Sequence, residues 1–393
     1  MGTLRQTTSR AAAHRVAARR LAIAGCAAVV ALAACTGQSA DQQVGASPAN
    51  GAISAASTPV PLSGPAEIDR RVSLIAGASQ RYRDLIRSFV VRLDGAVVAE
   101  HYGANGGPDV TSNIYSVTKS VTSMLIGIAI SDGSIPGVDS TVGQLLPGYL
   151  PVMAPGMADV TVRQLLTMTG GVIADDHIAD APDTDDWVAD VLSTPLQPPT
   201  ASGFAYSSSG YHLLSAILTT ATGRSALDYA RDKLFDPLGI STEPASQPVA
   251  VVDPVTSWDL APGFGWPVDP KGIQLGYSDL KLTATDMAKL GQLYLDQGRW
   301  QGGQIVPADW VAESTGPVVD PGFDGYRYGY GWWITTSAGH PAFAGLGDGG
   351  QVLQVVPDLG MVVVIAAKNG AGAFDEIDLL DIVEKQIVPI VSN

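Results

Sequence analysis

Two residues near the start of an apolar segment have the types and spacing that covalent catalysis needs. Ser116 and Lys119 stand three positions apart, and residues 116–130 read as a helix that is apolar nearly all round in its later part. Positions i and i+3 share one face of a helix, so the Lys119 amine can reach the Ser116 hydroxyl, and the helix N-terminus adds positive potential where an oxyanion would form. A buried lysine with a lowered pKa can take the hydroxyl proton. The same spacing also occurs by chance in solvated first turns of helices, so the pair needs support from other segments.

Two later segments offer that support. Tyr206 stands in a short polar loop just before a predicted helix, where its phenol could face a cleft and relay a proton. Residues 345–351 are glycine-rich and precede a predicted strand, and glycines let a substrate approach the backbone N–H groups that line an oxyanion hole. Both segments also have simpler interpretations, Tyr206 as a half-buried packing residue and the glycines as an ordinary turn.

The elements that must position these residues come from both ends of the chain and from its middle. Asp94-Gly95 separates two Val-rich runs within residues 89–102 and predicts a hairpin, because both positions tolerate positive φ. Further strands are predicted over residues 328–334, 352–356 and 361–365. Helices are predicted over residues 188–192, 211–221 and 226–234, from Thr283 onward, and over 376–388. The predicted fold class is therefore α/β, with a mainly antiparallel sheet flanked by helices plus a helical subdomain.

The sequence divides into a leader, a tether and one large domain. Residues 1–34 combine an Arg-bearing start with a short apolar run, and they end in Leu32-Ala33-Ala34-Cys35, a pattern that resembles a bacterial lipobox. We therefore expect export, with lipid modification of Cys35 and anchoring on the outer face of the cell membrane; the alternative is an ordinary secretory leader with a chance cysteine. Residues 35–64 lack large apolar side chains and predict a flexible tether. The expected domain is 65–393, with a sheet subdomain of about 65–115 and 320–393 and a helical subdomain of about 116–319.

Composition narrows the classes of function. The net charge is -15, with 38 acidic against 23 basic residues, which disfavours nucleic acid because neutralising phosphates needs clustered Lys and Arg. Both cysteines, Cys26 and Cys35, lie in the leader, so the domain has no thiol for a disulfide or a zinc site. The glycines at 345, 347 and 350 fit a dinucleotide-binding motif but lead into a strand instead of a helix, so that interpretation fails.

Taken together, the three segments resemble the serine β-lactamase and D-alanyl-D-alanine carboxypeptidase superfamily, in its class C-like branch, which also contains esterases and 6-aminohexanoate-dimer hydrolases. The resemblance covers about residues 85–390. It extends to residues 114–120, 162–171 and 286–295, which look like that branch's usual segments in the same order. The fold it implies is the β-lactamase/transpeptidase-like fold.

The resemblance also implies a role for each matching residue. Ser116 matches the acylated nucleophile, Lys119 the lysine that activates it, and Tyr206 the tyrosine that relays protons to the leaving group. The backbone N–H groups of Ser116 and Gln351 match the pair that binds the oxyanion. Hydrolysis would then run through an acyl-enzyme with no metal or other cofactor.

Two departures from the family pattern bear on the substrate. Ser208 replaces the Asn of the Y-x-N motif, whose amide binds the substrate's acylamide. The strand motif, which usually begins with Lys or His and ends with Gly, reads Asp348-Gly349-Gly350. A carboxylate there would repel the substrate carboxylate that β-lactamases and D,D-peptidases bind. The sequence therefore favours a neutral or cationic ester or amide.

An acidic run extends from Asp175 to Asp186 and has two interpretations. It could attract the cationic end of a substrate, or it could be a solvated surface segment.

We therefore predict a serine hydrolase that acts through an acyl-enzyme on a small-molecule or short peptide-like ester or amide outside the cytoplasmic membrane. Two alternatives stay open. One is a β-lactamase or D,D-carboxypeptidase, and the other is a non-catalytic envelope-binding protein that keeps the fold, consistent with the altered Ser208 and Asp348 positions.

Overall fold

The computed structural model describes residues 64–172, 184–198, 203–248, 258–259, 261–368 and 376–392. All of them belong to the unit that runs from Val60 to Asn393. The predicted leader and tether up to residue 63, with Cys35, and the part of the acidic run from Asp175 to Asp183 lie outside the described residues.

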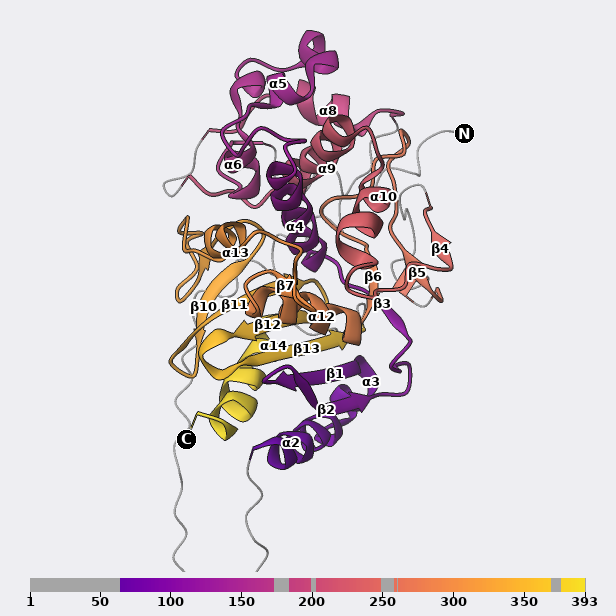
Figure 1. Cartoon of the computed structure of the whole chain (residues 1–393), viewed down its shortest axis with the longest axis vertical. Helices are drawn as coiled ribbons and strands as arrows, with labels where there is room; N and C mark the ends of the chain where they lie inside the picture. Colours follow the sequence, from indigo (N-terminus) through magenta and orange to yellow (C-terminus); the bar gives the residue numbers. More distant parts are fainter. Residues whose placement is uncertain are drawn as a thin grey trace, which may run out of the picture. The chain divides into compact units, whose positions relative to one another are not determined.

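A seven-stranded antiparallel sheet joins the two ends of this unit (Figure 1). Its strands, in spatial order, are β2 (Ala96–Tyr102), β1 (Ile86–Leu93), β13 (Met361–Ala367), β12 (Gln351–Val356), β11 (His340–Gly347), β10 (Trp333–Ser337) and β9 (Arg327–Tyr328). The turn between β1 and β2 is Asp94-Gly95, with φ angles of 49° and 81°, as its sequence predicts. The predicted fold class, an antiparallel sheet flanked by helices, is confirmed.

The central strand β13 is apolar throughout because helices cover both faces of the sheet. On β13, Met361, Val363 and Ile365 pack in one hydrophobic cluster, whereas Val362 and Val364 pack in the other. Successive side chains of a strand point to opposite faces, so both faces of β13 are buried.

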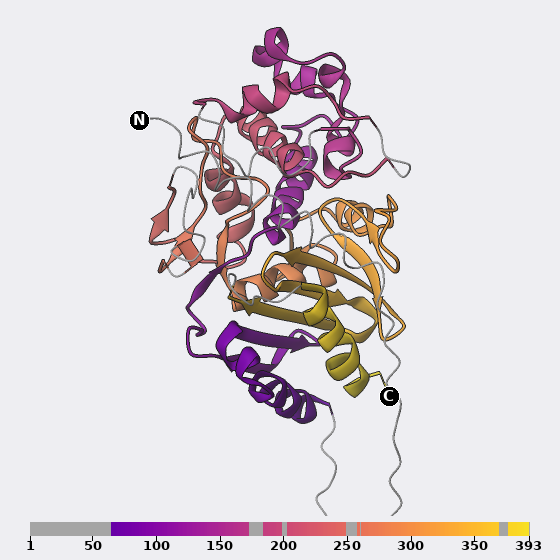
Figure 2. The ribbon, with the colours of Figure 1, turned by 180° about the vertical axis from the view of Figure 1, so that it is seen from behind.

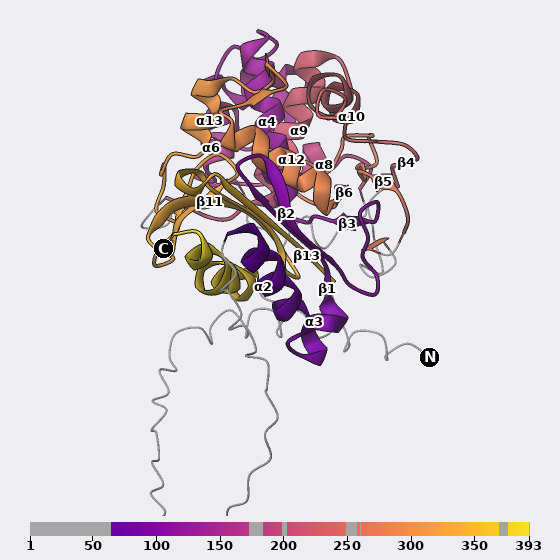
Figure 3. The ribbon, with the colours of Figure 1, turned by 60° about the horizontal axis from the view of Figure 1, so that its bottom comes forward.

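Different helices cover the two faces, as Figures 2 and 3 show. One face packs against α2 (Pro65–Gly77) and against the last helix, which begins as α14 (Glu376–Ile382). That last helix is not α-helical throughout, since it continues as a π-helical turn, η5 (Val383–Ile387), and a 3₁₀ turn, η6 (Val388–Ile390). The other face packs against α12 (Ala284–Leu295), whose N-cap is Thr283, although this range was expected within the helical subdomain.

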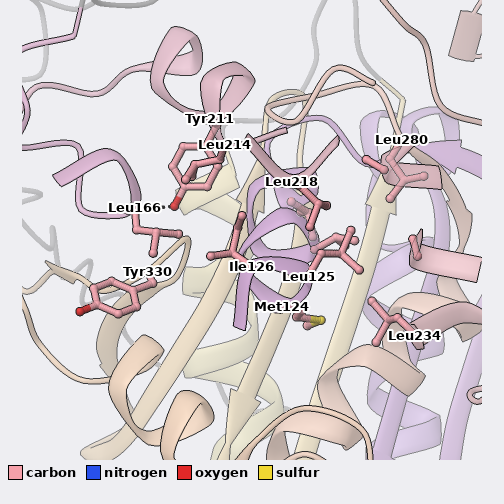
Figure 4. Close-up of a cluster of buried hydrophobic side chains, with 14 of the residues drawn as sticks. Met124, Leu125, Ile126, Leu166, Tyr211, Leu214, Leu218, Leu234, Leu280 and Tyr330 are labelled. Atoms are coloured by element: carbon pink, nitrogen blue, oxygen red, sulfur yellow. Dashed lines mark hydrogen bonds between the residues drawn. The ribbon is translucent and has the colours of Figure 1, made fainter. Parts of the chain in front are cut away.

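The helical part of the unit is built around two neighbouring helices, α4 (Val117–Ser131) and α9 (Ser208–Thr222). Figure 4 shows Leu125 and Ile126 of α4 near Leu214 and Leu218 of α9. The other helices and turns are α3 (Gln80–Leu85), α5 (Val142–Leu145), η1 (Pro147–Val152), η2 (Met157–Asp159), α6 (Val162–Leu166), α8 (Trp187–Ser193), α10 (Ala226–Ala230), η3 (Arg231–Phe235), α13 (Ala308–Ser314) and η4 (Pro357–Leu359). No helix in the described ranges combines the length and the apolar character that a membrane crossing requires.

A second, small sheet lies beside the start of α4. Its strands, in spatial order, are β3 (Thr111–Asn113), β6 (Lys281–Thr283), β5 (Phe264–Gly265) and β4 (Ala245–Ser246). A separate two-stranded sheet consists of β7 (Arg299–Trp300) and β8 (Gly303–Gln304). Because β3 leads directly into α4, this sheet fixes the backbone just before Ser116.

One predicted strand is wrong. Residues 328–334 were expected to form a single strand, but they form the end of β9, a turn and the start of β10. Gly331 has a φ of 79°, and a Cβ at this position would lie 2.8 Å from the Lys119 carbonyl oxygen. The glycine thus bends the chain onto the first turn of α4, where Ser120 Oγ donates to the Gly331 carbonyl at 2.6 Å.

The contact between α4 and α13 makes a testable prediction. Gly127→Ala is expected to destabilise the protein, although alanine favours a helix over glycine by about 1 kcal/mol. The new Cβ would lie 2.4 Å from the Trp310 ring, and overpacking of this kind costs about 1–3 kcal/mol. Urea denaturation should therefore show that the free energy of unfolding falls by about 1 kcal/mol in Gly127→Ala.

The control uses the Trp310→Ala background, in which the overlapping ring is gone. There Gly127→Ala should be neutral or stabilising, because only the helix propensity remains. Equal destabilisation in both backgrounds would contradict the packing argument.

Candidate active site

Ser116 lies at the N-terminus of α4 and is held by a strained, well-anchored residue before it. Tyr115 has a φ of 45°, a left-handed conformation that is unfavourable for a side chain of this size. Its backbone N–H donates to Asn113 Oδ1 at 2.9 Å, and its hydroxyl donates to Asp259 Oδ1 at 3.0 Å. Anchored at both ends, Tyr115 sets the direction in which the chain enters α4 and so places the Ser116 hydroxyl.

Lys119 is buried within the same turn, with 1% of its side chain exposed. Its Nζ donates to Ser116 Oγ at 3.0 Å, to Ser208 Oγ at 3.2 Å and to the Tyr277 carbonyl oxygen at 3.0 Å. These three acceptors match the three N–H groups of an ammonium. In the uncharged amine the nitrogen has a lone pair, and the Ser116 hydroxyl can then donate across the same 3.0 Å.

Tyr206 borders the same group from the loop that precedes α9. Lys119 Nζ lies 4.7 Å from the centre of the Tyr206 ring. The Trp333 ring stacks with Tyr206, with 6.3 Å between the ring centres. Ser207 caps α9 by accepting from Gly210 N–H at 3.0 Å, which directs Ser208 toward Lys119. The structure therefore brings Ser116, Lys119, Tyr206 and Ser208 together.

The glycine-rich segment approaches the nucleophile from the sheet. At Gly347, the last residue of β11, a Cβ would lie 2.4 Å from the Ile114 carbonyl oxygen and 3.2 Å from Tyr115 Cβ. Only a glycine at this position allows β11 to lie directly against the residues that precede Ser116.

The Asp348-Gly349-Gly350 segment, which was matched to the family's strand motif, lies in the turn between β11 and β12. Gly349 and Gly350 have φ angles of 76° and 93°, which a strand does not allow. Asp348 is exposed at this turn, whereas Gln351 is buried, pairs with Gly347 across the hairpin and donates from its side chain to the Ala367 carbonyl oxygen at 2.6 Å. On β11, Gly345 faces α4 and Gly347 faces the segment that precedes α4.

A buried polar network beneath Tyr115 was not found from the sequence, because its members are far apart in the chain and form no motif. Asn113 Nδ2 donates to Asp279 Oδ1 at 2.7 Å, and burial raises the pKa of Asp279. Burial also raises the pKa of Asp259, against the effects of the Tyr115 hydrogen bond and of Arg87. Arg87 donates to the Asp259 carbonyl oxygen at 3.0 Å.

Lys281 belongs to the same network and is 1% exposed. Its Nζ lies 5.0 Å from the Trp258 ring centre and donates to the Ala261 carbonyl oxygen. Burial, followed by the charge of Arg87, lowers the pKa of Lys281 to about 8.

A second buried pair supports Lys119 from the other side. His212 Nε2 and Asp269 Oδ2 lie 3.1 Å apart, and both side chains are fully buried. Asp269 also accepts from the backbone N–H groups of Lys271 and Ile273, and His212 packs against the Tyr277 ring at 6.1 Å. The pair thus ties the loop that carries the Tyr277 carbonyl to α9. The pair forms no local sequence motif, since its two members stand 57 positions apart.

Comparison with known proteins identifies the family of this chain. The family model described as Beta-lactamase matches residues 75–385, a range that contains every residue of the site. The chain belongs to the Beta-lactamase family.

Relatives of this Beta-lactamase family protein include hydrolases. The chain is 28% identical to penicillin-binding protein 4 of Amycolatopsis lactamdurans over 282 residues, which make up 65% of this chain and 71% of that protein. It is 25% identical to 6-aminohexanoate-dimer hydrolase of Paenarthrobacter ureafaciens over 304 residues, 70% of this chain and 71% of that one. The solved structure of EstCE1, described as a hydrolase with promiscuous acyltransferase activity, has the same fold, with a TM-score of 0.63 at 19% identity, covering 84% of this chain and 99% of that one. The protein is thus a hydrolase of the beta-lactamase fold.

The lowered pKa of Lys281 predicts a pH dependence of stability. Below about pH 8 the amine is protonated in both the folded and the unfolded chain, so the cost of burying its charge applies in full. Between about 8 and the ordinary value of 10.5 only the unfolded chain binds the proton, so the free energy of unfolding rises with pH. In Lys281→Met this rise should be absent.

The measurement is urea denaturation of both proteins at pH 7 and pH 9.5. Between these two pH values the free energy of unfolding of wild type should rise by about 2 kcal/mol more than that of Lys281→Met. Parallel pH profiles for the two proteins would show that Lys281 titrates near its ordinary value and would refute the prediction.

Proposed function

We propose that this protein is a serine hydrolase that forms an acyl-enzyme on a small ester or amide. The observation that carries the proposal is the 3.0 Å separation between Ser116 Oγ and Lys119 Nζ at a helix N-terminus. A hydroxyl becomes a useful nucleophile when a positioned base removes its proton, and Lys119 is the basic group in contact with it.

In the first step the Ser116 oxygen attacks the substrate carbonyl carbon while its proton passes to the uncharged Lys119 amine. The carbonyl oxygen gains the negative charge. It is stabilised by the N-terminus of α4, by the Ser116 N–H and by the N–H of Gln351 at the start of β12, the pair that the family resemblance implies. The bond to the leaving oxygen or nitrogen then breaks, and Tyr206 delivers a proton to that atom and is reprotonated from Lys119.

In the second step water replaces the leaving group. Its oxygen attacks the acyl carbon, the proton passes through Tyr206 and Lys119, and the ester bond to Ser116 breaks. Ser116 recovers its proton and the carboxylic acid is released. Both steps use the same three side chains, of which Lys119 is buried while Ser116 and Tyr206 are partly exposed beside it.

The charge around the site favours a substrate that lacks a carboxylate near the scissile bond. Asp348 stands in the turn directly after Gly347, which contacts the segment before Ser116. Two carboxylates about 4 Å apart in water repel each other by about 1 kcal/mol. We therefore infer that neutral or cationic esters and amides are preferred over β-lactams and peptides that end in D-alanine.

The first test compares wild type with Ser116→Ala on p-nitrophenyl acetate, together with labelling by a fluorophosphonate. Loss of the nucleophile should lower kcat/KM by at least about 10³-fold and abolish labelling. Ser131→Ala, at the exposed far end of α4, is the matched control and should behave as wild type.

The other outcomes decide between the alternatives. Equal rates in wild type and Ser116→Ala would favour a non-catalytic binding protein. Turnover of nitrocefin, or release of D-alanine from a peptidoglycan peptide, at rates above those of neutral esters would favour a β-lactamase or D,D-carboxypeptidase. Lys119→Arg keeps the charge but cannot give up its proton, so activity in that variant would show that Lys119 is not the base.

We also propose that the protein acts outside the cytoplasmic membrane, held by a lipid on Cys35. The support is the lipobox-like sequence that ends in this cysteine. In a bacterial host the full chain should enter the membrane fraction and incorporate a labelled fatty acid, and Cys35→Ser should do neither while keeping its esterase activity. Membrane association and lipid labelling that survive in Cys35→Ser would rule out this anchor.

A further inference from the structure

Four aromatic side chains form a continuous surface that begins at Tyr206. The Tyr206 ring lies nearly parallel to Trp333, with 13° between the ring planes and 6.3 Å between their centres. Trp333 also contacts Phe323 at 6.1 Å and Tyr326 at 6.2 Å. We call Tyr206, Trp333, Phe323 and Tyr326 the aromatic shelf.

The back of the shelf is closed and its front is open. Tyr328 and Phe204 pack against Trp333 from within the core and are 1% and 6% exposed. Trp333 and Tyr326 are half-buried, whereas Phe323 is 57% exposed. An exposed phenylalanine continuous with a candidate catalytic tyrosine is typical of a ligand-binding surface.

Strand geometry explains why one tryptophan of an adjacent pair reaches this surface. Trp332 is fully buried and packs against Tyr294 and Phe343, whereas Trp333 begins β10 and points to the opposite side. Successive side chains alternate in direction, so Trp332 packs in the core and Trp333 lies in the aromatic shelf.

The loop that carries Phe323 presents it at the edge of the site. Gly322 and Gly325 both have a φ of 82° and flank the aromatic residue and Asp324. Asp320, at the start of the same loop, forms an exposed ion pair with Arg327 at 3.5 Å. The edge of the shelf is therefore apolar with carboxylates beside it.

We propose that the aromatic shelf binds the leaving group of the substrate, and that this group is a large, flat, apolar alcohol or amine without a carboxylate. The proposal rests on the proposed function, in which Tyr206 protonates the leaving atom. The group attached to that atom then lies next to Tyr206 and extends across Trp333 to Phe323. Apolar contact with these rings supplies affinity, and Asp324, which is exposed in the same loop, disfavours an anionic group.

The test uses acetate esters of primary alcohols, because a shared acetyl group gives the same acyl-enzyme and the same deacylation step. We compare kcat/KM for ethyl acetate and 2-(2-naphthyl)ethyl acetate. Wild type should prefer the naphthyl ester by about 10-fold or more. Phe323→Ala and Trp333→Ala should each reduce this preference by about 2- to 10-fold, and Phe323→Leu should restore part of it.

Leu74→Ala is the matched control, since Leu74 is 54% exposed on α2, which packs on the other face of the sheet. It should leave the preference unchanged. A preference near one in wild type, or an unchanged preference in both shelf variants, would overturn the proposal. A preference that appears instead when the acyl group is enlarged, as in ethyl 3-(2-naphthyl)propanoate, would overturn the assignment to the leaving group.

Binding of 2-(2-naphthyl)ethanol, measured by titration of the full chain, separates the two proposals. Absence of hydrolysis with every ester, together with alcohol binding that Phe323→Ala weakens, would refute the proposed function alone. Hydrolysis of ethyl acetate without alcohol binding would refute the shelf alone.

Discussion

A lysine side chain removed from water must find acceptors for its N–H groups, and much of the domain is arranged to supply them. Lys119 meets Ser116 in its own helix, Ser208 at the start of α9 and the Tyr277 carbonyl in a loop before β6. Leaving such a group unpaired would cost several kcal/mol. The three contacts therefore join parts of the chain that are distant in sequence, and they do so at the point where the chemistry is proposed to occur.

The surroundings of this lysine are rigid on both sides, for different reasons. On one side the left-handed Tyr115 is anchored by Asn113 and Asp259, so the nucleophile's backbone has little freedom. On the other side the buried contact between His212 and Asp269 holds the loop of Tyr277 to α9. Rigid support of this kind places reacting groups before the substrate arrives, which lowers the entropy that must be lost on the way to the transition state.

The sequence predicts those parts of the structure that depend on local pattern. The Asp94-Gly95 turn, the Thr283 cap and the i, i+3 relation of Ser116 and Lys119 each follow from neighbouring residues. The strand expected over residues 328–334 is interrupted because the chain turns at Gly331 to pack against α4, which is distant in sequence. Residues 345–351 were expected to precede a strand, and the φ angles of Gly349 and Gly350 are those of a turn that leads into β12.

Residues that act through long-range contacts left no local signal. Asp259, Asp279 and Lys281 are ordinary residues in sequence and become a coupled network only when β6 lies beside β3. Trp333 belongs to no sequence motif, and its position against Tyr206 depends on how β10 meets the loop before α9.

The pairing of β1 with β13 has a consequence for how the protein is made. β1 ends at Leu93 and its inner neighbour begins only at Met361, so one edge of the first hairpin stays open during most of synthesis. Non-local pairing of this kind slows folding, and an open apolar edge invites association with other chains. Newly made molecules should therefore depend on holding chaperones until the final strand emerges, and shortening the chain before residue 367 should yield aggregates in place of a smaller folded domain.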